Sequence, residues 1–553
     1  MVSAKAFIEK PRLPLAILGI ILFTQLAFVL CSPKDVSWDP SHGLLAAQQH
    51  LVGVSPSIFT LVEAEPAQIT QVSTHPVSFW APAYQAVPYA LRFGVFDWGV
   101  ALNLTLGLAL IVGAIGWFTY FAQVLGSAGF ALWLSAVVAL TRFRWTMALT
   151  YDGGDQLIWG ASPWVLIIAA AALRLAKQGS TARATALSAV AGAAGASLFA
   201  LKYSGIFVAI GAGVVFGIVC LRHRYWQMIL LAGVGFLTVS GAIIWAVPQG
   251  ATPTSFGHPQ VSILLATASF GKPAIGVTDL DVLLRAILAN TSLKGELTAP
   301  FIGVGLSLVM LVGLVAYVRV SSAPLIRGDR VLVNLAIGAV IADFLILTLL
   351  ILKTGGTIPP LGRYSRVSGL LLLPLLVAVW EAMLHEHRSI WRAFAALGVL
   401  TLLILPTTLA TARQLPNLLG RLHRAPSETD FEGVVNKALT PGTDVRAFYA
   451  EIESISPNSV LYTIYPQMAF PLAKRSLILV EAEELETPAT LSARRYHGRP
   501  KDGVALLLPV WFEHNGKLEA IEASFVDIHQ FIRYDLRADR KWALWVGGSG
   551  TAN

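Results

Sequence analysis

Residues 13 to 31 read LPLAILGIILFTQLAFVLC, an apolar run without a charged residue. About 20 apolar residues cross the hydrocarbon core of a bilayer as a helix, so this run is long enough to span a membrane. Lys5, Lys10 and Arg12 precede it, as basic residues precede the apolar part of a signal peptide. The run is long for a signal peptide and lacks a small-x-small cleavage site, so we predict an uncleaved first membrane span.

Further apolar runs follow along most of the chain. Together with the first run they predict a mainly α-helical, polytopic membrane protein with about eleven transmembrane helices. The additional predicted spans cover residues 100–122, 124–141, 157–175, 184–201, 203–221, 228–248, 299–319, 331–352, 367–384 and 391–411.

The composition agrees with this class. Of 553 residues, 55% are hydrophobic and 13% are charged, whereas a soluble domain has about 25% charged residues. The net charge of +8 comes from Lys and Arg in short clusters between apolar runs. That pattern indicates membrane topology rather than nucleic-acid binding, and the two cysteines have no disulfide or metal-ligand spacing.

The basic clusters orient the chain. If the N-terminus is cytoplasmic, each short cytoplasmic loop but one contains a basic pair, as the positive-inside rule requires. The exception is the uncharged link at 124–126. The outer loops 32–99 and 249–298 and everything after residue 412 then lie outside. The basic pairs are Lys177 with Arg183, Arg222 with Arg224, Arg327 with Arg330, and Arg388 with Arg392.

The tail differs from the rest of the chain, because charges, prolines and polar residues return from Arg424 onward. Its β-rich runs begin at Val460, Val504 and Lys541. We therefore predict a transmembrane domain over 1–424 and a small, soluble, extracytoplasmic α/β domain over 425–553, a size that can bury its own core.

An acidic residue follows the first span directly. In Ser37-Trp-Asp-Pro-Ser-His-Gly, Asp39 and Pro40 open a short helix of mixed polarity at the membrane surface. The helix dipole favours a carboxylate there, so Asp39 can serve as the cap of this helix. The alternative is that Asp39 takes part in a reaction.

Several segments together resemble the polytopic GT-C glycosyltransferases, the group of the protein O-mannosyltransferases and the lipid A aminoarabinose transferase. Asp39, with Ala47 and Gly53 after it, is similar to the first outer loop of that group. Gly43 departs from it, because the group often has Tyr there, and Asp155 replaces a usual Glu. The other matching segments are His75-Pro-Val-Ser-Phe-Trp-Ala-Pro-Ala-Tyr84, Tyr151-Asp-Gly-Gly-Asp-Gln-Leu-Ile-Trp159, Leu201-Lys-Tyr-Ser-Gly205 and Gly362-Arg-Tyr-Ser-Arg366.

The resemblance implies a sugar donor carried on a polyprenyl phosphate and a cavity at the membrane surface. It assigns to Asp39 the role of general base, which takes a proton from the acceptor during inverting transfer. Cations must meet the charge on the leaving phosphate, and Arg363, Arg366 and Lys202 are the candidates. Interfacial snorkelling is the alternative role for these three side chains.

Other polar residues lie on the same predicted side. Asp152 and Asp155 can orient the acceptor, help to bind a divalent cation, or pair with Arg142 and Arg144. His75 can bind donor or acceptor. No residue cluster specifies a metal or another cofactor, and a divalent cation is left open.

Asp343 lies deep within the predicted span 331–352, where a carboxylate is costly unless it faces a cavity or a partner. In a transporter it would be a proton or ion site. We favour protonation or a hydrogen bond to a neighbouring helix.

The predicted function is transfer of a hexosyl or pentosyl group to a lipid, glycan or protein acceptor on the outer face of a bacterial inner membrane. A transporter or flippase of lipid-linked saccharides is one alternative, although the sequence lacks the inverted repeats and broken helices expected of it. A polymerase or ligase of another membrane fold is a second alternative, which the early Asp39 loop disfavours. No Walker or Rossmann phosphate loop appears.

Overall fold

The computed structural model describes residues 11–53, 67–70, 81–94, 96–246, 328–353, 364–385, 405, 408–409, 411–413, 415–420, 432–479 and 487–548. The predicted span 299–319, the predicted loop 249–298 and most of the predicted span 391–411 lie outside these residues.

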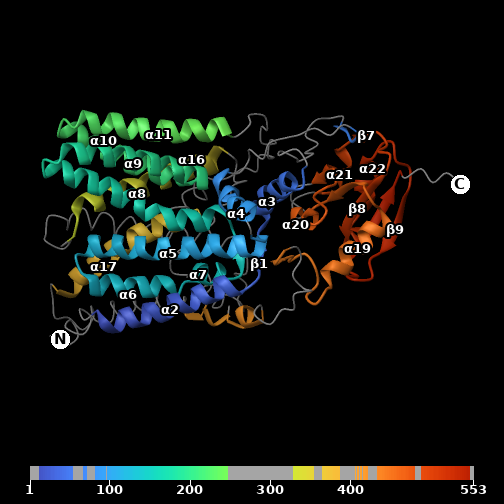
Figure 1. The fold of residues 1–553 in the computed structure, drawn as a ribbon, viewed down its shortest axis with the longest axis horizontal. Coiled ribbons are helices and arrows are strands. Elements are labelled where there is room, and N and C mark those ends of the chain that lie inside the picture. Colours follow the sequence, from blue (N-terminus) through green and yellow to red (C-terminus); the bar gives the residue numbers. More distant parts are fainter. Residues whose placement is uncertain are drawn as a thin grey trace.

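Within this described part, 7 helices are long and apolar enough to cross a membrane. They lie side by side along the long axis of the molecule (Figure 1). A mainly helical, polytopic membrane protein is thereby confirmed, while the total of about eleven spans stays a prediction. The helices are α2 (Arg12–Cys31), α5 (Trp98–Leu125), α8 (Gly154–Lys177), α9 (Thr181–Leu201), α10 (Gly205–Arg222), α11 (Trp226–Ala246) and α16 (Arg330–Lys353).

Two further apolar helices are α6 (Ala128–Ala139) and α17 (Arg366–His385). α6 has 12 residues and is shorter than the predicted span 124–141. The reason is local, because Gly126 takes a left-handed φ of 64° that ends α5, and the Ser127 hydroxyl then caps α6 by accepting from Phe130 N.

Small residues allow the spanning helices to approach closely. A Cβ added to Gly211 of α10 would lie 2.1 Å from the carbonyl oxygen of Gly338 in α16. One added to Gly192 of α9 would lie 1.9 Å from the carbonyl oxygen of Ala232 in α11. Helices pack in membranes through such contacts, so α10 and α16 form a fixed wall of the bundle.

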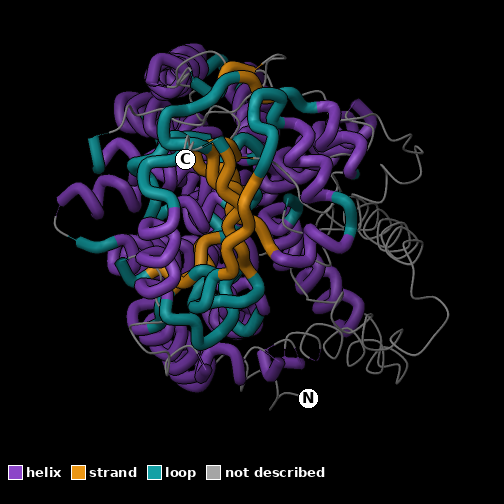
Figure 2. The backbone as a smooth tube through the Cα atoms, turned by 90° about the vertical axis from the view of Figure 1, so that its right-hand side faces the viewer, coloured by secondary structure: helices purple, strands orange, loops and turns teal. Residues whose placement is uncertain are grey.

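The C-terminal part is a mixed α/β unit at one end of the bundle (Figures 1 and 2). Its sheet has the order β6-β5-β8-β10-β9, in which β5 pairs in parallel with β6 and β8, and β10 pairs antiparallel with β8 and β9. The β-rich runs of the sequence become β5, β8 and β10. The elements of the unit include β5 (Val460–Thr463), β6 (Leu477–Leu479), β8 (Val504–Pro509), β9 (Phe531–Asp535), β10 (Trp542–Gly547), α19 (Val445–Ile455), α20 (Pro466–Ala469), α21 (Pro488–Ala493) and α22 (Lys517–Ser524).

A small parallel sheet lies where the bundle meets this unit. Its central strand is β1 (Lys34–Val36), which pairs with β3 (Thr150–Tyr151) on one side and β4 (Val434–Val435) on the other. Lys34 is fully buried, and its ammonium donates to the carbonyl oxygens of Val29 at 2.7 Å and Ser32 at 2.5 Å. A cation at the C-terminal end of α2 is favoured by the helix dipole, which fixes where β1 begins.

The C-terminal unit is joined to the bundle by its first residues. Arg92, in α4 (Ala83–Gly94), donates to both carboxylate oxygens of Glu432 at 2.7 and 2.8 Å. Gly99 N donates to the Glu432 carbonyl at 2.8 Å. Lys437 Nζ lies 2.8 Å from Oδ2 of the buried Asp35 in β1. The tail is therefore built into the frame of the bundle, a relation that the sequence did not predict.

We expect Lys437→Met to loosen this junction. Asp35 is fully buried, so loss of its cationic partner leaves a carboxylate with reduced compensation. Because the Lys437 side chain is half-exposed, the expected cost is about 1–3 kcal/mol. The measurements are the midpoint of thermal inactivation in detergent and amide hydrogen exchange at β1 and β4. Lys474→Met, at an exposed lysine of the same unit, is the control, and equal behaviour of the two variants would contradict the assignment.

Candidate active site

The parallel pairing of β1 with β3 brings two acidic helix starts together. Val36 is in register with Tyr151, and Ser37 N donates to the Tyr151 carbonyl at 3.1 Å. Asp39 follows β1 in α3 (Trp38–Leu51), and Asp155 follows β3 in the first turn of α8. Because the carboxyl ends of parallel strands meet at one edge of a sheet, Asp39 and Asp155 lie at the same edge.

Tyr84 of α4 lies directly against Asp39. Its hydroxyl donates to the backbone carbonyl of Asp39 at 3.4 Å, and its own carbonyl accepts from the Tyr151 hydroxyl. Burial, followed by the nearby Tyr151 and Asp39 charges, raises the pKa of Tyr84 well above its usual 10.0. Tyr84 is therefore a neutral hydrogen-bond donor at any physiological pH.

The position of Tyr84 also explains Gly43. A Cβ at Gly43 would lie 2.8 Å from the Tyr84 hydroxyl and 1.8 Å from Oε1 of Gln85. There is no room for a side chain on this turn of α3, because α4 occupies the space. The presence of Gly43, where the resembled group often has tyrosine, thus has a packing reason. Tyr84 from α4 fills the space that a side chain at position 43 would occupy.

The turn before α8 packs on the same cluster. Gly153 has a φ of 62°, and a Cβ added there would lie 3.2 Å from Pro40 Cβ and 3.1 Å from Tyr84 Cδ2. The start of α3 and the start of α8 are therefore in close contact. Asp152 lies in this turn, half-buried, and its backbone N donates to Oε1 of Gln156 at 3.0 Å.

His42 is the buried titratable group one helical turn after Asp39. Burial lowers the pKa of its imidazole from 6.5 to about 4, and a hydrogen bond to the Trp38 carbonyl, at 3.1 Å, opposes this shift only in part. His42 is therefore neutral at physiological pH and adds no positive charge beside Asp39.

This shift predicts a pH dependence of stability. As pH falls from about 6.5 to about 4, unfolded His42 takes up a proton and folded His42 does not, so the free energy of unfolding decreases by about 3 kcal/mol. Thermal inactivation of the parent should thus shift to lower temperature across this window. His42→Gln should show less of the shift, whereas His514→Gln, at an exposed histidine, should retain it. An unchanged shift in His42→Gln would contradict the prediction.

Asp155 forms an ion pair with Lys202. Lys202 Nζ lies 2.5 Å from Asp155 Oδ1, and both side chains are largely buried. Lys202 caps the C-terminal end of α9, and its ammonium also lies 4.8 Å from the ring centroid of Tyr364. Two candidates that the sequence placed in separate roles are therefore one unit.

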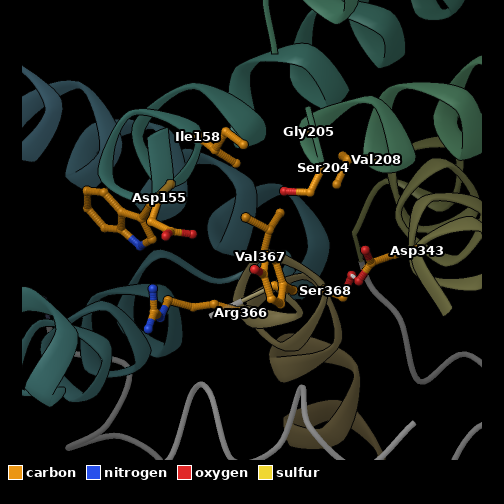
Figure 3. A pocket seen from close by; sticks show the side chains of 11 residues that line it. Asp155, Ile158, Ser204, Gly205, Val208, Asp343, Arg366, Val367 and Ser368 are labelled. Atoms are coloured by element: carbon orange, nitrogen blue, oxygen red, sulfur yellow. Dashed lines mark hydrogen bonds between the residues drawn. The ribbon is translucent and has the colours of Figure 1, made fainter. Parts of the chain in front are cut away.

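Beside this pair is a small pocket with an open mouth, seen from close by in Figure 3, whose cavity volume is about 20 Å³. α8, α10 and α17 all begin at it, so the N-terminal ends of their helix dipoles give this end of the pocket a positive potential. Its lining residues are Asp155, Ile158, Trp159, Ser204, Gly205, Val208, Asp343, Tyr364, Arg366, Val367 and Ser368.

One arginine lines the pocket, and a second packs against its Trp159. Arg366, in the first turn of α17, lines it and lies 3.7 Å from the ring centroid of Phe143. Arg144 is buried in α7 (Arg142–Thr146), where it lies 4.1 Å from the ring centroid of Trp159 and donates to Oε1 of Gln25 at 3.1 Å. Burial lowers the pKa of Arg144 to about 9. The sequence had allowed an ion pair between Asp155 and Arg144, but in the structure Asp155 forms its ion pair with Lys202.

The structure thus brings Asp39, Asp152, Asp155, Lys202 and Arg366 to one end of the bundle. The candidates Arg363 and His75 lie outside the described residues. Within the described part of the chain, no three His, Cys, Asp or Glu side chains are arranged to hold a metal ion.

Sequence reasoning missed some pocket residues. Ser204 and Ser368 line the pocket, but isolated serines at helix starts carry no sequence signal. Asp343 was singled out in the sequence as a costly carboxylate within an apolar span, but it was not assigned to the candidate site. The Ser368 hydroxyl donates to Asp343 Oδ2 at 2.5 Å, which is the hydrogen bond to a neighbouring helix that the sequence favoured.

No known family profile and no curated protein matches the sequence. Among solved structures, the chain is similar to ArnT from Cupriavidus metallidurans bound to undecaprenyl phosphate, with 13% identity over 98% of each chain and a TM-score of 0.46. The apo state of that protein gives 13% identity, 98% of each chain and a TM-score of 0.48.

The chain is also similar to the oligosaccharyltransferase of Archaeoglobus fulgidus in complex with zinc and sulfate. Here the identity is 12%, over 96% of this chain and 73% of that one, with a TM-score of 0.45. At these identities the similarity concerns the arrangement of helices alone.

Proposed function

We propose that this protein is an inverting membrane glycosyltransferase that moves a hexosyl or pentosyl group from a polyprenyl phosphate to a lipid, glycan or protein acceptor. The observation that carries the proposal is the edge of the β1-β3 pair, where Asp39 lies at the same edge as Asp155, and Asp155 lines a pocket together with Arg366 and the starts of three helices. A carboxylate and a cationic, partly apolar pocket are what this reaction needs.

In the proposed reaction, the acceptor hydroxyl oxygen attacks the anomeric carbon of the donor sugar from the face opposite the phosphate. The Asp39 carboxylate takes the hydroxyl proton as the new glycosidic bond forms. The bond between the anomeric carbon and the phosphate oxygen breaks, and its electron pair leaves with the phosphate. The products are the glycosylated acceptor, with inverted configuration, and polyprenyl phosphate.

The pocket supplies what the leaving phosphate requires. Arg366 presents a planar guanidinium that suits phosphate oxygens. The N-terminal ends of α8, α10 and α17 add their dipoles, which favour an anion at this place. These groups stabilise the charge that develops on the phosphate as the bond breaks.

Lys202 and Asp155 act as a pair in this proposal. The ion pair holds the Lys202 ammonium beside the pocket, where it adds to the positive potential, and it fixes the start of α8 against the end of α9. Asp152 in the preceding turn is available to orient the acceptor. His75 and Arg363, which lie outside the described residues, keep the roles that the resemblance implies, His75 with donor or acceptor and Arg363 with the donor phosphate.

The location follows from the same arrangement. The exposed apolar side chains of the bundle, such as Leu237 of α11 and Leu345 of α16, face the bilayer, where the polyprenyl chain of the donor resides. We assign the pocket and the C-terminal unit to the outer side of a bacterial inner membrane, because the basic loops define the opposite end as cytoplasmic.

The test is transfer by purified protein in liposomes. Radiolabelled polyprenyl phosphates carrying a hexose or a pentose are supplied with a membrane extract as acceptor. We expect label to leave at least one carrier and to appear in the acceptor, with polyprenyl phosphate released in equal amount. Movement of intact carrier across the bilayer without cleavage would instead indicate a flippase, and extension of a lipid-linked chain would indicate a polymerase.

A further inference from the structure

The segment that carries Asp39 is held by the C-terminal unit as well as by the bundle. Before Asp39, β1 pairs with β4 at the start of that unit, with Asp35 in register with Val435. At Asp39 itself, α20 of the unit lies beside α3 (Figure 1). Trp38, which is the first residue of α3 and the direct neighbour of Asp39, therefore lies where the C-terminal unit meets the candidate site.

A tyrosine of the C-terminal unit packs on Trp38. The ring of Tyr465 lies edge-on to the ring of Trp38, with centroids 5.7 Å apart and an angle of 74° between the ring planes. Tyr465 also lies edge-on to Trp542 of β10 at 5.7 Å, and Trp38 lies edge-on to the imidazole of His42 at 5.5 Å. Aromatic pairs prefer this geometry. The four rings form an aromatic row from the sheet of the C-terminal unit to the first turn of α3.

The aromatic row is anchored firmly in the C-terminal unit. Trp542 is 2% exposed, and its indole N–H donates to the Ala438 carbonyl at 3.1 Å. Tyr465 directly precedes Pro466, whose ring restricts the backbone at the first position of α20. The Tyr465 carbonyl accepts from Met468 N at 2.9 Å. The position of the Tyr465 ring is therefore set by the C-terminal unit and not by Trp38.

The orientation of Trp38 depends on this contact. Within the described residues, the ring partners of Trp38 are His42, which belongs to the same helix, and Tyr465. The bundle holds the adjacent backbone, where the Tyr84 hydroxyl donates to the Asp39 carbonyl at 3.4 Å. A catalytic group has to be held within about 0.5 Å and about 10–20° of its productive geometry. A small rotation of the first turn of α3 would thus be enough to misplace the Asp39 carboxylate.

We propose that Tyr465 is a positioning residue for Asp39. It orients the first turn of α3 through Trp38, so that the Asp39 carboxylate reaches the acceptor hydroxyl. Tyr465 contacts neither donor nor acceptor in this role, and the C-terminal unit becomes an integral part of the catalytic domain. The inference rests on the proposed function, because it takes Asp39 as the general base.

The experiment separates the rate of transfer from donor binding, with the full-length protein in liposomes. Tyr465→Leu should lower the single-turnover rate of sugar transfer by about 10- to 100-fold, because a displacement of about 1 Å can cost about 100-fold. The dissociation constant of undecaprenyl phosphate should stay that of the parent, since the residues that line the pocket belong to the bundle. Tyr465→Phe retains the ring and should keep most of the rate.

Two further measurements connect the effect to Asp39. Tyr465→Leu should slow transfer far less in Asp39→Asn than in the parent, because the two changes act on the same group. Amide hydrogen exchange at the start of α3 should become faster in Tyr465→Leu, a change that can be read without any transfer. Trp38→Leu removes the same ring contact from the side of the bundle and tests the inference if Tyr465→Leu does not fold.

The matched control is Phe525→Leu. Phe525 is 2% exposed and lies edge-on to Tyr462 at 5.8 Å within the C-terminal unit, so this change also replaces one ring of an aromatic pair by leucine. It should lower the stability of the unit and leave both the rate of transfer and exchange at the start of α3 unchanged.

The inference is overturned if Tyr465→Leu transfers at the rate of the parent, if Tyr465→Phe is as slow as Tyr465→Leu, or if Phe525→Leu slows transfer equally. It is also overturned if Tyr465→Leu weakens donor binding as much as it slows transfer, or slows Asp39→Asn by the same factor as the parent. In each of these cases the proposed function survives, because the parent transfers sugar. Absence of transfer by the parent would overturn both.

Discussion

Asp39→Asn is expected to lower the rate of sugar transfer by about 100- to 10,000-fold, the range that a general base contributes. Asparagine preserves the shape of the side chain but cannot accept the acceptor proton. Donor binding should change little, because Asp39 is not among the residues that line the pocket. The measurements are single-turnover transfer of label in liposomes and the dissociation constant of the donor in nanodiscs.

The control for this prediction is Asp444→Asn. Asp444 also precedes a helix, α19, where its side chain accepts from Ala447 N at 3.1 Å, but it lies in the C-terminal unit. Its replacement should affect local stability and leave transfer unchanged. If Asp39→Asn transfers at the rate of the parent, or if it loses transfer only because it unfolds, Asp39 is a helix residue and another group is the base.

Replacement of Arg366 should act on the donor rather than on the proton transfer. A charge-assisted hydrogen bond contributes about 1.5–3 kcal/mol, so Arg366→Gln is expected to weaken binding of undecaprenyl phosphate by about 10- to 100-fold. Arg366→Lys keeps the charge but loses the planar fork and should recover part of that loss. The measurement is the dissociation constant of undecaprenyl phosphate, at low and at moderate salt.

Arg222→Gln is the matched control, because Arg222 is exposed at the end of α10 opposite to the pocket. It should leave carrier binding unchanged. Equal weakening in both variants would indicate a general effect of charge on carrier partitioning into the nanodisc, and no weakening in Arg366→Gln would remove Arg366 from the phosphate site.

The site was only partly predictable from the sequence. Asp39, Asp155, Lys202 and Arg366 were identified as separate candidates through the resemblance, and all four lie at one end of the bundle. Their relations were not predictable, because no sequence pattern pairs Lys202 with Asp155 or sets Tyr84 against Gly43. Such contacts join different helices, and no local pattern encodes them.

The membrane class and the approximate positions of the described spans were determined by the sequence alone, because hydrophobicity summed over about 20 consecutive residues is a local property. The same is true of the β-rich runs of the tail, where apolar residues are contiguous in β8 and β10. The early end of α6 was harder to foresee, since it depends on the backbone conformation of Gly126.

Only the tertiary structure decided how Asp39, Asp155 and the tail come together. Strands β1, β3 and β4 contain two or three residues each, too few to show an alternating pattern. They form because buried backbone groups must find hydrogen-bond partners, and the partners come from segments far apart in the chain, as when Ser37 N donates to the Tyr151 carbonyl. The choice among such partners depends on how the surrounding helices pack, which is why the chemistry-bearing edge is a property of the folded molecule and not of any one segment.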